Sequence, residues 1–412
     1  MANPQITKAR DTLRNLEILA TVAESMAKRR RSGLADGGDA PNGKEYRRYN
    51  QAEALEDLQI NTRTLNKRCS ELGIDPKDGG YRWSITLPEL MKLRKVIFHD
   101  QLIVRPDNAK PLVIAISNLK GGSGKTQTAV MASTGMATQL KSGYRVALID
   151  CDPQGTGTMY LAPSFDADNE LTFGDLMTEG YELQPGQTFN DVCKAAFKKT
   201  NIPNLDLLPA DVNDNYIELY LQEQTSTQGS DFNPYDKLRK VVDAVEDQYD
   251  IIFIDTGPSI DFKVMNALYA ANACIIPVQA QQNDEDATSK YLGSLHRIYA
   301  RLEAAGHPGW AFTKLLISRL NRRSSSELTT ASRFRASFDV FMMGSDLISS
   351  EAIKFCSTQL ASIYEFSASE YPKGRVSLKT VQSETEAFLN ELENLLLRYW
   401  GITDFSLHGI KN

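Results

Sequence analysis

The sequence has few cysteines, no long apolar run and little net charge, and each shortage excludes a class of protein. Five cysteines stand far apart among 412 residues with no C-x-x-C pair, which argues against a disulfide framework, a structural zinc site or an iron–sulfur cluster. No apolar run approaches the roughly 20 residues that cross a bilayer, and the first twenty residues lack the apolar core of a signal peptide. Hydrophobic residues make up 42% and charged residues 24%, which excludes a disordered or fibrous chain. We therefore expect a cytoplasmic protein.

The net charge of −6 argues mildly against a nucleic-acid-binding protein, but it is unevenly distributed. Residues 1–105 hold 19 Lys and Arg against 14 Asp and Glu, so the remaining residues carry −11. Within that acidic part, residues 311–380 hold 10 basic against 6 acidic residues. Such asymmetry permits nucleic-acid-binding faces on an acidic protein.

The N-terminal segment, residues 1–43, is predicted to be one amphipathic helix followed by a linker. Apolar residues recur at helical spacing from Thr7 to Arg31, whereas Ser32–Gly43 is rich in Gly, Asp and Pro and is expected to be flexible. An isolated amphipathic helix does not bury its own stripe. It is expected either to pack on the body of the chain or to pair with another subunit as a dimerisation helix.

Residues 44–108 are predicted to form a separate winged helix–turn–helix domain. Helices are expected over Gln51–Leu58 and Thr62–Leu72, followed by a short strand at 81–85 and a helix from about Pro88 to Phe98. In such a domain the second helix enters the major groove. Its candidate DNA contacts are Arg63, Lys67 and Arg68. A purely structural helical connector is the alternative.

From residue 109 to residue 412 the pattern predicts an α/β domain with a doubly wound, mostly parallel sheet. Buried strand-like runs alternate with helical segments, which is typical of parallel strands covered on both faces. In this fold the ligand binds beyond the carboxyl ends of the strands. The six runs are 112–118, 145–151, 205–209, 250–255, 273–279 and 314–319.

A glycine-rich loop between the first of these strands and a helix predicts a phosphate site. Its glycines let backbone N–H groups point at phosphate oxygens, and the helix that follows adds the positive end of its dipole. Lys125 is expected to reach the β- and γ-phosphates and Thr126 to bind Mg²⁺. The ordinary P-loop pattern has a glycine at position 119, where this chain has Leu119. The candidate phosphate-binding residues are Lys120, Gly121, Gly122, Ser123, Gly124, Lys125, Thr126 and Gln127.

This loop, K-G-G-x-G-K-T, resembles the deviant Walker A motif of the ParA/MinD superfamily of P-loop ATPases. The resemblance implies that Lys120 reaches the phosphates of a partner subunit, so that two ATP molecules are sandwiched in a homodimer. A second ammonium group near the γ-phosphate would stabilise the charge that spreads in phosphoryl transfer.

Two carboxylate motifs follow strands in the order that the resemblance requires. Asp150-Cys151-Asp152-Pro153-Gln154-Gly155 resembles the family's D-x-D-P-Q-G stretch, which implies that Asp152 positions the attacking water. Asp255 ends a later apolar strand, as in a Walker B element, and is expected to hold Mg²⁺ through water. Asp150 is a further candidate for the metal. The expected catalytic set is Lys120, Lys125 and Asp152, with ATP or ADP and Mg²⁺ as cofactors.

The D-P-Q-G form favours the partition ATPases of the ParA family, and the N-terminal part resembles their long subgroup. The resemblance implies a slow, Mg²⁺-dependent ATPase that segregates a plasmid or chromosome on the nucleoid with a ParB-type partner. It also implies binding to DNA without sequence preference, as a dimer or a filament, and repression of its own operon through operator DNA. Candidate contacts for non-specific DNA are Arg319, Arg322, Arg323, Arg333, Arg335, Lys354, Lys373 and Arg375.

Two other functions remain open. A nucleotide-gated transcriptional repressor would use the helix–turn–helix alone. A membrane-positioning ATPase like MinD would need a basic amphipathic terminus, but the C-terminal segment holds Glu391 and Glu393 and few basic residues. We expect that segment, Thr385–Trp400, to be a helix docked on the body with no membrane contact.

Overall fold

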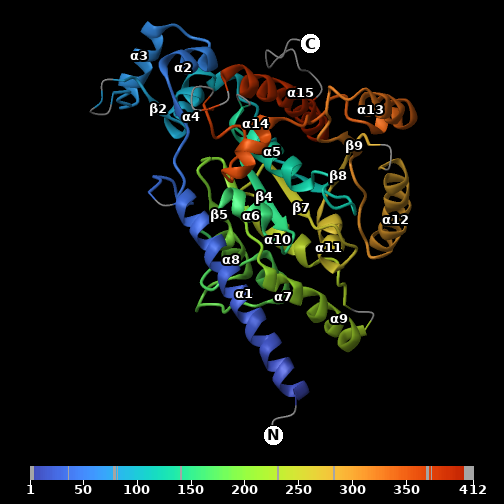
Figure 1. Ribbon diagram of the computed structural model, residues 1–412. Coiled ribbons are helices and arrows are strands. Elements are labelled where there is room, and N and C mark those ends of the chain that lie inside the picture. The colour runs from blue at the N-terminus through green and yellow to red at the C-terminus, as the bar shows by residue number, and fades with distance from the viewer. Residues whose placement is uncertain are drawn as a thin grey trace.

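The computed structural model describes residues 4–35, 37–77, 80, 82–139, 142–229, 232–281, 284–367, 371–372 and 374–402. Its centre is a seven-stranded sheet in the order β5-β6-β4-β7-β3-β8-β9, seen in Figure 1 among helices on both sides. The strands are β3 (Leu112–Ile116), β4 (Val146–Cys151), β5 (Lys198–Lys199), β6 (Leu205–Leu208), β7 (Ile251–Thr256), β8 (Ala273–Val278) and β9 (Thr313–Ile317).

All six predicted strands are present and run parallel, so the expected α/β class is confirmed. The prediction missed β5, which pairs antiparallel with β6 at one edge. This strand has two residues, both lysine, and so lacks the apolar run that marks the others.

Alternate residues of the central strands enter two separate hydrophobic cores. Ile114 packs in the core that includes α5 (Lys125–Thr138) and α15 (Arg375–Tyr399). Val113 packs in the core beneath the helices of the opposite face, because successive side chains of a strand point to opposite sides. The remaining helices of this domain are α6 (Thr156–Leu161), α7 (Phe173–Thr178), α8 (Phe189–Ala196), α9 (Tyr216–Gln228), α10 (Lys237–Val245), α11 (Phe262–Ala270), α12 (Asp284–Ala304), α13 (Ser325–Phe338) and α14 (Glu351–Thr358).

The N-terminal unit contains the predicted helices and packs directly on the α/β domain. It comprises β1 (Arg48–Tyr49), α2 (Gln51–Leu58), α3 (Thr62–Glu71), β2 (Ile85–Thr86) and α4 (Leu87–Ile97), with β1 and β2 antiparallel. Asn50 and Asn61 cap α2 and α3 through their side chains. The predicted strand at 81–85 is only Ile85–Thr86, and part of that range lies outside the described residues. Leu58 and Leu90 join the same hydrophobic core as β3.

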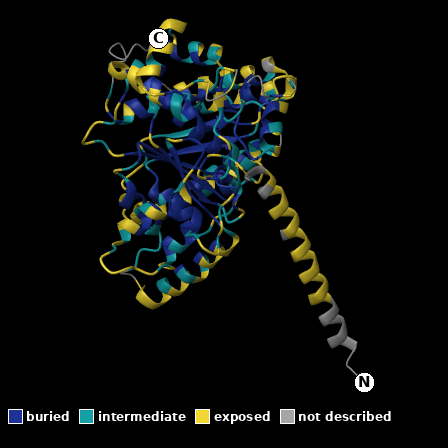
Figure 2. Cartoon of the chain, turned by 90° about the vertical axis from the view of Figure 1, so that its left-hand side faces the viewer, coloured by how far each residue is buried: buried dark blue, intermediate teal, exposed yellow. Residues whose placement is uncertain are grey.

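The first helix, α1 (Pro4–Ala35), is longer than predicted and lies away from the body of the protein (Figure 2). Its apolar stripe is exposed: Leu13, Leu19 and Met26 keep 64–68% of their surface. The body of the chain does not cover this stripe, so the expectation that the helix packs on it is wrong. Pairing with another subunit remains a prediction.

The expectation of a flexible linker over 32–43 is wrong where the structure describes it. Residues 33–35 continue α1, and Gly38–Lys44 folds into a turn closed by backbone hydrogen bonds. Asn42 Nδ2 donates to the Leu161 carbonyl at 2.7 Å, and Lys44 Nζ donates to the Tyr160 carbonyl at 2.6 Å. Polar side chains at 42 and 44 anchor the turn to the end of α6, which the Gly, Asp and Pro content did not reveal.

The C-terminal helix is docked as predicted but begins ten residues earlier, at Arg375. Phe388, Leu389 and Leu392 are fully buried against the domain. The buried Glu393 accepts a hydrogen bond from the Tyr144 hydroxyl at 2.6 Å, which explains an acid on the inner face of the helix. Among the described helices none is both long and apolar enough to cross a membrane.

Candidate nucleotide site

The glycine-rich loop lies at the carboxyl edge of the sheet, between β3 and α5. Gly122 and Gly124 have φ of 77° and 89°, the left-handed region that favours glycine. Lys125 opens α5 and keeps only 7% of its surface, with its Nζ 3.4 Å from the Lys120 carbonyl oxygen. The loop therefore curls around the position that Lys125 and the N-terminus of α5 face together. This geometry is suited to an anionic ligand.

Burial lowers the pKa of Lys125, while the carboxylates of Asp255 and Asp152 oppose that shift. A buried ammonium group whose one hydrogen bond goes to a backbone carbonyl, and which forms no ion pair among the described residues, is costly unless a ligand completes the site. The phosphate oxygens of a bound nucleotide would supply negative charge to pair with Lys125.

Two aspartates lie side by side at the ends of neighbouring strands, as Asp150 of β4 is in register with Asp255 of β7. Both are fully buried. Burial raises the pKa of Asp150 to about 6, opposed by hydrogen bonds from Thr158 and from the Asp152 amide. Burial and the neighbouring Asp150 also raise the pKa of Asp255, which Thr126 and Lys125 oppose.

The two aspartates differ in what their oxygens contact. Asp150 Oδ2 accepts hydrogen bonds from the amide and hydroxyl of Thr158 at 2.7 and 2.9 Å, and so holds α6. Both oxygens of Asp255 are buried without a hydrogen bond of ordinary geometry among the described residues, and the Thr126 side chain is the group that approaches them. Unmatched buried carboxylate oxygens beside a threonine hydroxyl fit Mg²⁺, a hard cation that prefers oxygen ligands and keeps several waters. Of the predicted metal ligands, Asp255 and Thr126 fit better than Asp150.

Lys120 forms an ion pair with Asp284 of its own chain, at the start of α12. Asp284 keeps 2% of its side-chain surface and Lys120 keeps 34%. The Lys120 amide donates to Asn118 Oδ1 at 2.9 Å, which fixes the backbone of the loop. The side chain that is expected to act in a partner subunit therefore has an intrachain partner.

A family model and a known protein each match this chain over about half of its length. The family model AAA_31, described as an AAA domain, matches residues 112–305. The chromosome partitioning protein ParA of Caulobacter vibrioides is 30% identical over 234 residues, which cover 56% of this chain and 78% of that protein. This chain belongs to the ParA family of partition ATPases.

Similarity to the family extends beyond the ATPase domain. A candidate replication protein A of Sinorhizobium fredii is 25% identical over 84% of this ParA-family chain and 86% of its own length. The solved structure of a "Partition Protein" shares the fold with a TM-score of 0.62 at 20% identity, and covers 92% of this chain and 98% of its own. The shared fold therefore extends beyond the α/β domain into residues 1–108.

The candidate DNA-binding residues of this ParA-family chain do not form one free basic patch. Four of the basic residues at 319–375 are in ion pairs with carboxylates, namely Arg322 with Glu384, Arg333 with Glu285, Arg335 with Asp346 and Lys354 with Glu351. Arg323 is exposed, and no ion pair is found for it among the described residues. Lys373 and the side chain of Arg375 lie outside the described residues.

On α3, Arg63 and Lys67 are exposed and Arg68 is partly buried. Lys67 and Arg68 both approach Glu71, at 3.8 and 2.8 Å. Of the three, Arg63 has no ion pair among the described residues, and the contact of all three with DNA remains a prediction.

Sequence reasoning missed several residues that shape the P-loop. Gln279 Nε2 and Arg319 Nη1 both donate to the Gly122 carbonyl, and Ser318 Oγ donates to the Ser123 carbonyl. They follow β8 and β9, so the rule that ligands bind beyond the carboxyl ends of parallel strands was the available signal. Arg319, predicted to contact DNA, lies beside the nucleotide loop.

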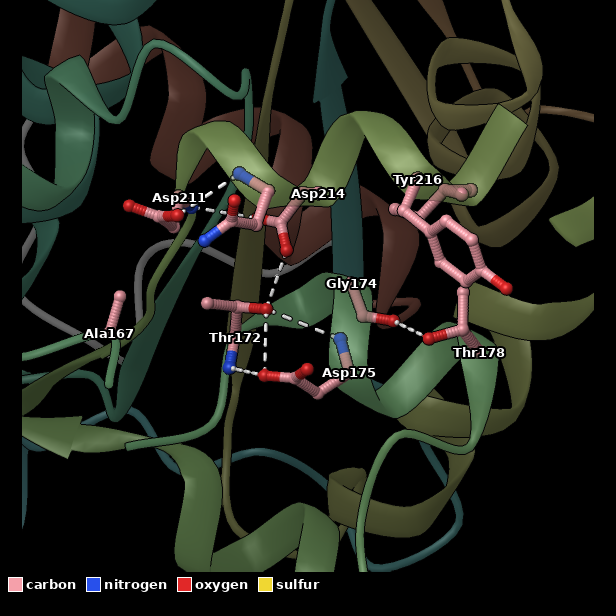
Figure 3. Close-up of a pocket in the computed structure, with 10 residues that line it drawn as sticks. Ala167, Thr172, Gly174, Asp175, Thr178, Asp211, Asp214 and Tyr216 are labelled. Carbon is pink, nitrogen blue, oxygen red and sulfur yellow. Dashed lines mark hydrogen bonds between the residues drawn. The ribbon is translucent and has the colours of Figure 1, made fainter. Parts of the chain in front are cut away.

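A separate cavity of about 270 Å³ follows β6 and is lined by acidic residues (Figure 3). Its carboxylates are used within the protein: Asp175 caps α7 at Thr172, and Asp214 accepts hydrogen bonds from the Thr172 hydroxyl and the Asp211 amide. Burial raises the pKa of Asp214 to about 7. We assign this cavity a structural role.

Proposed function

We propose that this ParA-family chain segregates a plasmid or chromosome through an ATP-dependent sandwich dimer that binds DNA. A ParB-type partner would stimulate slow, Mg²⁺-dependent hydrolysis and release the dimer from the nucleoid. The observation that carries this proposal is the convergence of Lys125, Asp152 and Asp255 at the P-loop, with a buried ammonium group facing two carboxylates. That arrangement supports binding of a nucleotide with its cation.

Each residue of the site has a distinct proposed role. Lys125 and the loop amides bind phosphate, and Thr126 and Asp255 hold Mg²⁺, which neutralises charge that develops on the phosphates. Asp152, part-exposed at the end of β4, orients the attacking water. Lys120 stabilises the phosphates bound by the partner subunit.

The intrachain ion pair of Lys120 opposes the proposed dimerisation unless nucleotide is bound. Lys120 must leave the carboxylate of Asp284 before it reaches a phosphate of the other protomer. Exchange of one anionic partner for another is favourable only when the partner subunit holds nucleotide. We infer that this exchange makes dimerisation depend on ATP.

The N-terminal unit is proposed to supply a second dimer contact and sequence-specific DNA binding. The exposed stripe of α1 would pair with a second copy, and α3 would contact operator DNA and repress the operon. Lys44 and Asn42 tie this unit to α6, which directly follows the Asp152 loop. This connection also favours the second candidate function, a repressor whose operator affinity depends on the bound nucleotide.

The decisive experiment measures DNA binding of purified protein with ATP, ADP or no nucleotide, on operator and random DNA, at two salt concentrations. Lys125→Ala should abolish ATP-dependent binding to random DNA, while Lys240→Ala, an exposed lysine on α10, serves as the control. Wild-type DNA binding by Lys125→Ala would overturn the proposed mechanism. Operator binding that responds to nucleotide, with no binding to random DNA, would favour the repressor. Co-sedimentation with liposomes in ATP would favour a membrane-positioning ATPase.

A further inference from the structure

Arg319 lies at the carboxyl end of β9 with an unusual backbone conformation. Its φ is 55°, a left-handed conformation that few residues other than glycine adopt. The backbone is tied on both sides, because the Ser318 amide donates to Val278 and the Leu320 amide to Leu347. Such strain persists where the surrounding structure requires it, and it is common at functional sites.

This conformation directs the Arg319 side chain onto the P-loop. Its Nη1 donates to the Gly122 carbonyl oxygen at 3.0 Å, and Gln279 Nε2 donates to the same oxygen at 2.8 Å. Ser318 Oγ donates to the next carbonyl, that of Ser123, at 2.6 Å. Three side-chain donors from the ends of β8 and β9 therefore hold two consecutive P-loop carbonyls.

Holding these carbonyls also orients the amides that are expected to bind phosphate. In a trans peptide the C=O of one residue and the N–H of the next point in opposite directions. Fixing the Gly122 carbonyl toward β9 turns the Ser123 N–H away from it, into the loop, where it donates a hydrogen bond to the Lys120 carbonyl oxygen at 3.4 Å. Fixing the Ser123 carbonyl turns the Gly124 N–H in the same way.

The packing around Gly124 supports the same conclusion. A Cβ at this position would meet the Ser318 Cβ at 3.3 Å and the Arg319 Cγ at 3.5 Å. The end of β9 thus lies directly against the loop, and the aliphatic part of Arg319 forms one of its walls.

We propose that Arg319 is a positioning residue of the nucleotide site, fixing the Gly122 peptide and with it the shape of the P-loop, and that it is not a DNA contact. This inference rests on the proposed function, since it assigns Arg319 to the ATP site described there. It revises the expectation that Arg319 contacts DNA.

The test compares Arg319→Ala with Arg323→Ala, an exposed arginine four residues away, and with Arg319→Lys. The affinity for a fluorescent ATP analogue, the KM and kcat for ATP, and DNA binding at saturating ATP are measured for each. Loss of a charge-assisted hydrogen bond should weaken nucleotide binding about tenfold and raise KM similarly, with kcat within about twofold. Arg319→Lys should recover part of the affinity, and DNA binding at saturating ATP should stay near wild type.

The opposite pattern overturns the proposal: nucleotide affinity unchanged in Arg319→Ala, with DNA binding weakened at saturating ATP. Should Arg319→Ala fail to fold, Gln279→Ala tests the same peptide through its second donor and should also raise the KM for ATP. An unchanged KM for ATP in Gln279→Ala would then overturn it. Lys125→Ala in the same titration separates the two hypotheses, because retained nucleotide binding there would contradict the ATP site itself.

Discussion

Charged side chains are used in opposite ways at the nucleotide edge and in the basic stretch 311–380. At the nucleotide edge Lys125 and Asp255 are buried, and neither forms an ion pair among the described residues. In the basic stretch Arg322 and Arg333 are exposed and Arg335 is partly buried, and each pairs with a carboxylate of its own chain. Burying an unmatched charge is costly, whereas an exposed ion pair contributes little. Burial therefore indicates a functional role far more strongly than a count of basic residues does.

The difference is also one of geometry. The residues of the nucleotide edge come from the ends of β3, β4 and β7, which neighbour one another in the sheet. The basic residues come from the loop after β9 and from α13 and α14, and each finds a different acidic partner.

The largest effect is expected at Asp152. Asp152→Ala should lower ATP turnover at least about 100-fold, because the attacking water loses its orienting carboxylate, while nucleotide and DNA binding persist. Phosphate release under saturating ATP checks this, together with DNA binding in the same buffer. The control is Asp168→Ala, an exposed acid on a nearby loop. Normal hydrolysis by Asp152→Ala would show that another group positions the water.

Buried acids at this edge should also make stability depend on pH, which exposed arginines cannot do. Asp214 follows β6, and burial raises its pKa to about 7. The folded protein then holds a proton that the unfolded chain releases, so stability is full below the unfolded pKa and is lost as pH rises toward 7. Between about pH 5 and about pH 8 the loss should be of order 2 kcal/mol.

Urea unfolding at the two pH values measures this effect in the wild type and in Asp214→Asn. The variant should lose less stability over that range, whereas Arg322→Gln should keep the wild-type profile. Equal losses in the wild type and Asp214→Asn would mean that the pKa of Asp214 is not raised.

Much of the nucleotide site could be predicted because it is local in sequence. Gly121–Thr126 is expected to bind phosphate largely through its own backbone, and Asp150 and Asp255 each end an apolar strand that the sequence marks clearly. Asp284, Gln279 and Arg319 could not be assigned, since their roles depend on which strands are neighbours. That order, with β3 between β7 and β8, is a property of the whole fold.

The two long terminal helices show a second limit. The apolar stripes of α1 and α15 have similar spacing, yet Leu392 is fully buried and Leu16 keeps 56% of its surface. Amphipathic spacing predicts that a face will be covered, but it does not specify by what. The contacts of Asn42 and Lys44 with α6 could not be predicted either, because they lie in a segment whose composition is typical of a linker.

A moderate effect is expected from the ion pair between Lys120 and Asp284. Asp284→Asn should lower the ATP concentration needed for half-maximal dimerisation about fivefold, because Lys120 no longer leaves a carboxylate partner. Sedimentation across an ATP titration measures this, with the exposed Asp286→Asn on the same turn of α12 as the control. Weaker dimerisation of Asp284→Asn would instead mean that Asp284 supports Lys120 in the ATP-bound state.

The smallest effect is expected within the basic stretch itself. Arg323 is exposed and Arg335 is held by Asp346, so Arg323→Ala should weaken binding to random DNA about threefold and reduce the salt slope by about one. Arg335→Ala should change DNA affinity less than about twofold. Both are measured at saturating ATP over a series of salt concentrations. A larger loss for Arg335→Ala would show that DNA displaces Asp346, since phosphate then competes successfully for a guanidinium that the free protein holds in an ion pair.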